Sequence, residues 1–331
     1  MTLSNLIESF MKILFCLLLS ICSIQVTIGQ VVESNSPRAE VNRYTSLAAW
    51  GVNAYWIETT KSIVLIDAQL LPADAKKIAS IIKTTNKPLA AVFITHPHPD
   101  HFAGLALLKD EFGQFPIYSS KTTAEKLESS LKRFLNSSFS KPFGDKVEKR
   151  FTGITKTLQH KEVVVIDGLK FQLDDLGAGE SENNSLIYLP QKKWLFTGDA
   201  TMHHVHYYLG EGRSKKILSQ LEYIKKEYEK NILFTGHGEP GRTTIIDQQI
   251  NYIQLLRKSV SDAIQHKANL SSDKSHLIKN KRQEIAQRIY KKYPYFGDFG
   301  IEPIQVISMN LWGVETELLS GIKARHSSVE K

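Results

Sequence analysis

Four side chains that can bind a metal ion stand within six residues of one another: His96, His98, Asp100 and His101. They directly follow the apolar segment 89–94, which is typical of a buried β-strand. A tight loop at the end of that strand can direct the two alternate histidines toward one point and the Asp-His pair toward a neighbouring point. Pro97 and Pro99 restrict the backbone and are expected to keep this turn from continuing as a helix. The spacing therefore predicts two adjacent metal ions, with a histidine-rich surface loop as the alternative.

This run resembles the signature of the metallo-β-lactamase superfamily, whose members have a four-layer αββα fold and a binuclear zinc site. The strand ending in Asp67 precedes the run, as it does in that family. The segment Phe196-Thr-Gly-Asp199 is similar to the one that carries the family's metal-bridging aspartate. The segment Phe234-Thr-Gly-His237 is similar to the one that carries its last ligand histidine. The resemblance covers roughly residues 45–245 and implies an α+β four-layer αββα sandwich.

One position departs from the family pattern. Most members carry a histidine after a glycine at this point, whereas this chain reads Gly177-Ala-Gly-Glu180-Ser-Glu182, so the third histidine of the first metal site is absent. Glu180 is the preferred substitute because a carboxylate oxygen is an acceptable zinc ligand. The alkylsulfatase branch of the superfamily also carries a glutamate at the equivalent place. Glu182 is the competing ligand, and a weak or vacant first site is the third alternative.

The resemblance implies seven metal ligands: His96, His98, Glu180, Asp100, His101, Asp199 and His237. This mixture of nitrogen and oxygen donors suits two Zn²⁺ ions, with iron or manganese as alternatives. Two metal ions this close lower the pKa of a water molecule between them, which supplies a hydroxide nucleophile. Asp100 is expected to steer that hydroxide as well as to bind the second metal, and Asp67 to hold a ligand or the motif loop from behind. His203 is the third catalytic candidate; it and its neighbours His204 and His206 either line the pocket or face solvent.

The N-terminus has the pattern of an export signal. Lys12 is followed by the apolar run 13–22, which is too short to span a bilayer comfortably, and the stretch ends at the small residue Gly29. Cleavage after Gly29 would give a periplasmic or secreted protein without a stable membrane anchor; a retained single-pass anchor is the alternative. Both cysteines of the chain lie in the apolar run, which excludes disulfides and cysteine ligands from the mature protein.

Strand and helix patterns alternate along most of the remaining chain, which favours a layered arrangement of helices and sheet. Apolar β-type segments occur after a short polar lead-in, at 52–57, 63–66, 89–94, 163–166, 186–189, 194–196 and 232–234. Residues 121–161 carry ten Lys and Arg against four Asp and Glu, and we interpret them as a basic insertion near the pocket. The predicted organisation is a signal peptide at 1–29, a catalytic domain at 30–263 and a C-terminal helical extension at 264–331.

The chain of 331 residues is 42% hydrophobic and 23% charged, which excludes disordered, collagen-like and coiled-coil proteins. The observations together predict an exported, binuclear zinc-dependent hydrolase that uses a metal-bound hydroxide on a small-molecule ester, lactone or lactam. The formal net charge of +8 and the basic insertion favour an anionic substrate. The main alternative is a sulfate-ester hydrolase, which the glutamate at position 180 favours. Nucleic-acid processing and a non-catalytic metal-binding protein are weaker alternatives, and no nucleic-acid partner is expected.

Overall fold

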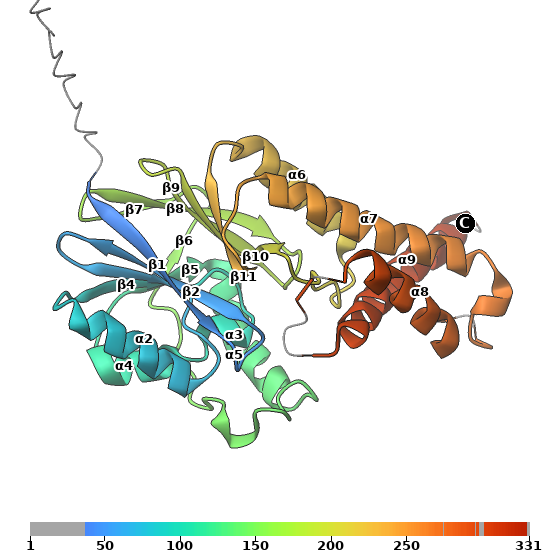
Figure 1. The fold of residues 1–331 in the computed structure, drawn as a ribbon, viewed down its shortest axis with the longest axis horizontal. Helices are drawn as coiled ribbons and strands as arrows, with labels where there is room; N and C mark the ends of the chain where they lie inside the picture. The colour runs from blue at the N-terminus through green and yellow to red at the C-terminus, as the bar shows by residue number, and fades with distance from the viewer. Residues whose placement is uncertain (1–36, 274, 295, 298–300, 330–331) are drawn as a thin grey trace, which may run out of the picture. The chain divides into compact units, whose positions relative to one another are not determined.

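The computed structural model describes residues 37–273, 275–294, 296–297 and 301–329, with side chains up to residue 320. The segment Ser36–Lys331 forms one compact unit (Figure 1). The predicted signal peptide at 1–29 lies outside the described residues.

Within the described residues, eleven strands form one hydrogen-bonded sheet. Ten of them follow the order β6-β5-β4-β3-β2-β11-β10-β9-β8-β7, and β1 pairs with β2 outside this order. The N-terminal half contains β1 (Ala39–Ser46), β2 (Val52–Thr59), β3 (Ile63–Ile66), β4 (Leu89–Phe93), β5 (Ile117–Ser120) and β6 (Lys156–Leu158). The C-terminal half contains β7 (Val163–Ile166), β8 (Leu169–Gly177), β9 (Asn184–Leu189), β10 (Trp194–His203) and β11 (Ile232–Gly238). The halves join between β2 and β11, where the paired residues are Val52 and His237.

The two halves of the sheet pack face to face across a shared apolar core. One buried cluster combines Val64, Ala91 and Phe93 from the first half with Phe171 and Ile187 from the second. The rings of Phe93 on β4 and Phe171 on β8 stack with centroids 5.3 Å apart. Each fully buried side chain of this size contributes about 1.5 to 3 kcal/mol to the free energy of unfolding, so this core holds the two halves together.

Helices cover the outer face of each half (Figure 1). On the N-terminal half these are α2 (Pro72–Thr84), α3 (Pro99–Phe102), α4 (Leu105–Phe112) and α5 (Lys121–Leu135). On the C-terminal half they are α6 (Ser214–Glu227), α7 (Thr244–Ile264), α8 (Lys279–Lys292) and α9 (Pro303–Val329). Two short 3-10 turns complete the list: η1 (Gly144–Lys146) follows α5, and η2 (Lys267–Asn269) follows α7. The four layers are thus helices, half-sheet, half-sheet and helices, as the αββα prediction requires.

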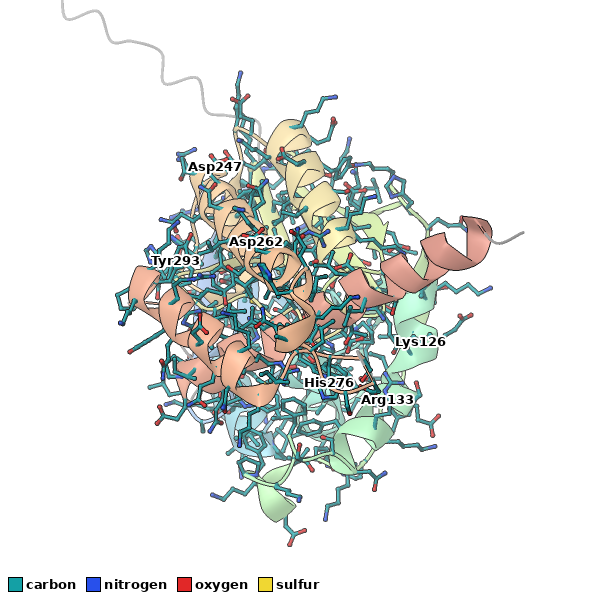
Figure 2. All side chains as sticks on the ribbon, turned by 90° about the vertical axis from the view of Figure 1, so that its right-hand side faces the viewer. Lys126, Arg133, Asp247, Asp262, His276 and Tyr293 are labelled. Atoms are coloured by element: carbon teal, nitrogen blue, oxygen red, sulfur yellow. The ribbon has the colours of Figure 1, made fainter. Side chains whose placement is uncertain are left out.

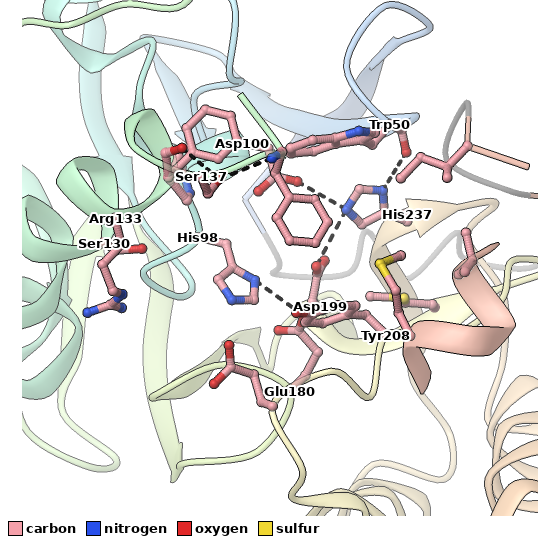
Figure 3. A pocket seen from close by; sticks show the side chains of 18 residues that line it. Trp50, His98, Asp100, Ser130, Arg133, Ser137, Glu180, Asp199, Tyr208 and His237 are labelled. Atoms are coloured by element: carbon pink, nitrogen blue, oxygen red, sulfur yellow. Dashed lines mark hydrogen bonds and ion pairs between the residues drawn. The ribbon is translucent and has the colours of Figure 1, made fainter. Parts of the chain in front are cut away.

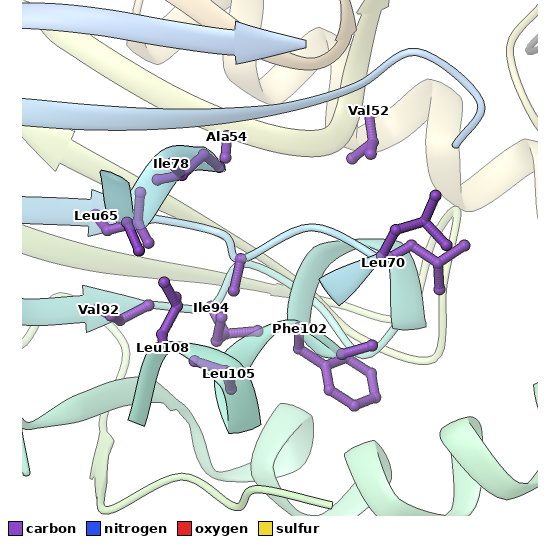
Figure 4. Packing of buried hydrophobic residues seen from close by; sticks show 14 of the residues in the cluster. Val52, Ala54, Leu65, Leu70, Ile78, Val92, Ile94, Phe102, Leu105 and Leu108 are labelled. Atoms are coloured by element: carbon purple, nitrogen blue, oxygen red, sulfur yellow. The ribbon is translucent and has the colours of Figure 1, made fainter. Parts of the chain in front are cut away.

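The amphipathic pattern of α2 shows how the sequence builds the outer layers. Pro72 occupies a first-turn position, where its missing N–H costs nothing. Ala75, Ile78, Ala79 and Ile82 then recur at helical spacing and are all buried. They pack on the apolar face of the half-sheet with side chains such as Leu65, Val92 and Leu105 (Figure 4).

The sequence analysis predicted no strand in the polar lead-in before residue 52, whereas Ala39–Ser46 forms strand β1 in antiparallel register with β2. Its side chains are mostly exposed or half-buried, since β1 lies at the side of the sheet, and an edge strand of this kind lacks an apolar signature. The basic stretch 121–161 is built around α5, which buries Leu127, Leu131 and Phe134 on the half-sheet. Figure 2 shows Lys126 and Arg133 projecting from this same helix.

The C-terminal helices share a core with the second half-sheet. Helix α9 packs on α6, α7 and α8, and its buried side chains Ile307, Leu311 and Val314 join the cluster that covers β10. The domain boundary after residue 263 stays a prediction. No helix within the described ranges combines the length and apolar character that a membrane span requires.

Asn310 ties α9 to the rest of the unit by hydrogen bonds that are fully buried. Its Nδ2 donates to the carbonyl oxygen of Tyr207 at 2.6 Å and to Tyr252 Oη at 3.2 Å. Its Oδ1 accepts from the backbone N–H of Leu209 at 2.7 Å. A buried amide with three partners fixes the position of the helix along the strand-to-helix connection after β10.

We expect Asn310→Ala to lower the free energy of unfolding by about 2 to 3 kcal/mol, because it leaves three buried groups without their partner. The measurement is urea unfolding followed by circular dichroism. The matched control is Thr316→Ala on the same helix, where an exposed hydroxyl bonds only the carbonyl of Trp312. An equal loss of stability in both variants would contradict this role of Asn310.

Candidate metal centre

The predicted ligands converge at one end of the sheet, although they come from four separate parts of the chain. Two groups of side chains each place their nitrogen and oxygen atoms within 4.8 Å of one another. The first group comprises His96, His98, Glu180 and Asp199. The second group comprises Asp100, His101 and His237. This partition agrees with the predicted division of the motif into two alternate histidines and an adjacent Asp-His pair.

The motif loop differs from the prediction in one respect. Pro99 does not prevent a helix but begins one, the four-residue helix α3. The ring fixes φ near the helical value and the first helical position needs no N–H donor, so proline is compatible with this place. This turn of helix is what presents Asp100 and His101 as neighbours on the same side of the cluster.

Asp199 lies between the two groups. Its Oδ2 is 3.7 Å from His96 Nε2 and 3.4 Å from His237 Nε2, while its Oδ1 is 3.3 Å from His101 Nε2. Asp100 Oδ2 lies 3.3 Å from His237 Nε2. One carboxylate that faces histidines of both groups is placed as a bridging ligand would be.

Several of these atoms are better placed to bind a metal ion than to form hydrogen bonds with one another. Within the described part of the chain, four buried atoms face the cluster without a well-formed hydrogen bond: His96 Nε2, His101 Nε2, Glu180 Oε2 and Asp199 Oδ1. Burying such groups without compensation costs about 1 to 3 kcal/mol each. Imidazole nitrogens and carboxylate oxygens that converge in this way are the donors that zinc and similar divalent ions prefer. The residues present therefore fit a pair of metal ions.

The electrostatics of the cluster show how strongly its charges depend on one another. Burial raises the pKa of Glu180 to about 7, against the opposing effect of His98. Burial would lower the pKa of His98, but the Glu180 carboxylate beside it raises the pKa to about 9. Burial would also lower the pKa of His237, yet Asp199 and Asp100 raise it to about 10. A metal ion that binds here displaces protons from these histidines. Its positive charge then balances the negative charge of the carboxylates in place of the protonated histidines.

The loop between β8 and β9 directs Glu180 inward and Glu182 outward. Glu180 is only 1% exposed, and its Oε1 lies 3.2 Å from His98 Nδ1. Glu182 instead pairs with Arg133 at 2.5 Å and with Lys126 at 3.6 Å, both on α5. Of the two glutamates, the geometry therefore brings only Glu180 to the cluster.

Contacts from the C-terminal half hold this loop in place. Arg213 donates to the carbonyl oxygen of Ser181 at 2.8 Å. Gln220 on α6 donates to the carbonyl oxygens of Leu176 and Ala178. The backbone on both sides of Glu180 is thus fixed before any metal binds.

Asp67 lies behind the cluster, in contact with one of its histidines, and is not among the residues that line the cavity. It lies just after β3 with φ of 60°, and its Oδ2 is 2.8 Å from His101 Nδ1. Its Oδ1 accepts from the backbone N–H of Thr95 at 2.9 Å, and the Thr95 hydroxyl lies 3.0 Å from His96 Nδ1. These bonds leave Nε2 of both histidines free to face the cluster.

His237 is held by a backbone atom that the sequence does not reveal. Its Nδ1 lies 2.9 Å from the carbonyl oxygen of Trp50, a residue with φ of 55°. The preceding residue, Gly236, lies so close to Asp199 that no side chain fits: a Cβ at this position would stand 2.0 Å from Asp199 Oδ1. Gly198 has φ of 47°, and a Cβ there would collide with Thr95. Both glycines of the Thr-Gly-Asp and Thr-Gly-His segments thus allow the strands to bring their ligands together.

The structure does not bring His203 to the cavity. Its Nδ1 is 2.9 Å from the carbonyl oxygen of Glu239, which directly follows β11, and His203 is not among the residues that line the cavity. His204 is exposed, and His206 is buried with its Nδ1 3.2 Å from Tyr252 Oη. Proximity in sequence to Asp199 was the basis of the His203 prediction, and the irregular end of β10 turns these side chains away.

A cavity of about 250 Å³ opens beside the ligands (Figure 3). His98, Asp100, Glu180, Asp199 and His237 line its inner end. The remaining lining is mostly apolar or aromatic and comes from the β1–β2 turn, α5, the segment after β10 and α9: Trp50, Pro99, Ser130, Arg133, Phe134, Ser137, Phe139, Met202, Tyr208, Glu211, Ile301, Val306 and Met309. Sequence reasoning missed Arg133, Tyr208 and the α9 side chains, which carry no local motif.

Comparison with known proteins identifies the family. The model of the metallo-beta-lactamase superfamily matches residues 47–237. A probable metallo-hydrolase of Streptococcus pyogenes is 37% identical over 79 residues, which are 24% of this chain and 33% of that protein. The match thus spans a third of that relative's length. The metallo-beta-lactamase type 2 of Bacillus cereus is 25% identical over 221 residues, which are 65% of this chain and 78% of that protein.

A solved structure supports the same fold. The beta-lactamase domain protein of Burkholderia ambifaria superimposes with a TM-score of 0.62 at 13% identity, covering 86% of each chain. The predicted family and four-layer fold are confirmed by these matches. Because the family model covers more than half of the chain, this protein belongs to the metallo-beta-lactamase superfamily.

Proposed function

We propose that the chain is an exported, binuclear zinc-dependent hydrolase of a small-molecule ester, lactone or lactam. The observation that carries the proposal is the convergence of seven nitrogen and oxygen donors in two groups with Asp199 between them. The prediction of a metal-dependent hydrolase agrees with the names of similar proteins. Export rests on the apolar run 13–22, which carries the pattern of a signal peptide.

Divalent metal ions held here would activate a water molecule for attack and polarise the oxygen of the bond to be cleaved. The chain's own residues supply the positioning. Asp100 lines the cavity, so its carboxylate can accept a hydrogen bond from the attacking water and orient it. Tyr208 also lines the cavity, and burial raises the pKa of its hydroxyl, which therefore stays protonated as a donor to a substrate oxygen.

The size of the cavity favours a compact substrate. About 250 Å³ of space, closed on several sides by Trp50, Phe134 and Val306, accommodates a small molecule rather than a nucleic-acid strand. Arg133 is the basic side chain at the rim and could attract an anionic group of the substrate. We therefore propose a small-molecule partner and no nucleic-acid partner.

A sulfate-ester hydrolase is the second candidate. The inward position of Glu180 favours it, because the alkylsulfatase branch of the superfamily carries a glutamate at the equivalent place. Activity against aryl sulfates that exceeds activity against aryl esters would support this candidate over the first.

The central experiment measures metal content and hydrolysis of the purified protein after zinc loading. We expect close to two zinc ions per chain and turnover of at least one member of a panel that contains nitrocefin, aryl esters, lactones, aryl sulfates and a phosphodiester. Asp199→Ala should lose both metal ions together, because one carboxylate serves both groups. Asp110→Ala is the control, since that carboxylate lies on the surface beside Arg150. Unchanged metal content in Asp199→Ala would contradict the proposed centre.

A pair of variants tests the assignment of the unusual ligand. We expect Glu180→Gln to weaken binding of one metal equivalent and to lower kcat roughly a hundredfold or more, because an amide oxygen is a poor replacement for an anionic ligand. Glu182→Gln, two residues away, should change neither quantity appreciably, since Glu182 pairs with Arg133 and Lys126. Elemental analysis and steady-state kinetics measure both. Metal loss in Glu182→Gln with retention in Glu180→Gln would reverse the assignment.

Asp67 provides a test that alters no ligand. Asp67→Asn keeps the size of the side chain, and asparagine tolerates the left-handed backbone conformation at this position. We expect zinc affinity to fall about tenfold to hundredfold, because the hydrogen bond that orients His101 loses its charge. Competition with a chromophoric chelator measures the affinity, and Asp110→Asn serves as the surface control. Equal affinities in the two variants would show that Asp67 does not position His101.

A further inference from the structure

A second cavity lies next to the one at the metal ligands. It has a volume of about 420 Å³ and is formed by the β1–β2 turn, the loop after α5 and the first turns of α9. The two cavities share four lining residues: Trp50, Phe139, Ile301 and Met309. The two cavities therefore adjoin each other at these side chains, and the ligand cluster lies in the first cavity.

The second cavity has an uncharged lining that includes exposed apolar side chains. None of the described residues that line it is acidic or basic, and its polar members are Ser138 and Gln305. Leu47 at the β1–β2 turn is 93% exposed and Phe139 is 38% exposed. Large apolar side chains left in contact with water beside a recess commonly mark a surface that binds an apolar ligand.

Fixed elements form the walls of the two cavities. The Trp50 ring packs edge-to-face against Phe134 and Phe143, with centroids 5.7 and 5.0 Å away. Met309 precedes Asn310, whose buried hydrogen bonds fix α9. A preformed cavity with uncharged walls binds a flexible chain at lower entropic cost than a surface that must first order itself.

Part of the cavity wall comes from the C-terminal segment, outside the residues that the family model matches. Ile301, Val306 and Met309 lie beyond residue 237, where that match ends. Val306 and Met309 on α9 are three residues apart and thus share one face of the helix.

We propose that the second cavity binds an unbranched apolar chain of the substrate while the bond to be cleaved lies at the ligand cluster. The inference rests on the proposed function and narrows its substrate class to esters that carry a linear alkyl chain. The uncharged lining favours such a chain over a charged or strongly polar one, because burying an unpaired charge is costly. The chain belongs either to the acyl group or to the alcohol of the ester.

Two series of esters measure the effect of chain length on the zinc-loaded protein. The first contains p-nitrophenyl acetate, butyrate, hexanoate and octanoate; the second contains acetates of alcohols of increasing length. In one series kcat/KM should rise about threefold to fourfold for each added methylene until the second cavity is filled, as expected for burial of a CH₂ group. The series that rises identifies the side of the ester on which the chain lies. Hydrolysis without dependence on length in either series would overturn the proposal.

Variants at the junction of the two cavities separate this effect from general hydrophobicity. Met309→Trp should block the junction and remove most of the advantage of octanoate over acetate. Thr316→Trp adds the same ring at an exposed position of α9 outside both cavities and should keep the chain-length profile. Gln305→Glu places a charge in the second cavity at an exposed residue that the fold tolerates, and it should lower the advantage of octanoate severalfold. An unaltered profile in both Met309→Trp and Gln305→Glu would overturn the proposal.

A binding measurement distinguishes failure of this inference from failure of the proposed function. Calorimetric titration of the zinc-loaded protein with acetate, butyrate, hexanoate and octanoate should show affinity that increases with length and a negative heat-capacity change. Length-dependent binding with no hydrolysis of any ester would overturn the proposed ester chemistry and support the chain-binding cavity. Hydrolysis combined with equal affinity for all four carboxylates would overturn the chain-binding cavity alone.

Discussion

Three carboxylates, Asp100, Glu180 and Asp199, are buried in the two adjoining groups of ligands, and this concentration of negative charge constrains the rest of the structure. Such groups cannot be removed from water unless positive charge or hydrogen-bond donors compensate them. Histidines supply part of that compensation, which is why burial and the nearby carboxylates act in opposite directions on the pKa of His98 and of His237. Divalent cations would complete the compensation of the buried negative charge. The arrangement is therefore physically consistent with a metal centre and not with a purely structural core.

The fold meets this requirement by joining its two halves at the site. Val52 on β2 pairs with His237 on β11 where the half-sheets meet, and the Trp50 carbonyl just before β2 orients the same histidine. Asp67 from the first half orients His101, whereas Asp199 and Glu180 come from the second half. Neither half alone carries enough donors for two metal ions, so the apolar core between the halves also determines the geometry of the ligands.

Features that depend on local sequence were predictable, and features that depend on distant packing were not. The motif run, the Thr-Gly-Asp and Thr-Gly-His segments and the inner strands have local signatures, because buried strands are continuously apolar and ligand types are chemically distinctive. Strand β1 escaped prediction because its side chains are mostly exposed or half-buried. Tyr208 and Arg133 escaped because only the fold brings them to the cavity, and His203 was assigned by sequence proximity although the end of β10 turns it toward Glu239.

The distinction between local sequence and distant packing also separates the metal ligands from the walls of the cavity. The ligand cluster is built from segments that the family shares, so it can account for the type of chemistry but not for the choice of substrate. The apolar walls of the cavity come from the β1–β2 turn, α5 and α9, and α9 lies beyond the residues that the family model matches. Because Asn310 fixes α9 through buried hydrogen bonds next to Met309, the helix can present a rigid apolar surface without disturbing the ligands. Substitutions on the side of α9 that faces the cavity would therefore alter the cavity wall, whereas the ligands and their supporting hydrogen bonds would stay the same.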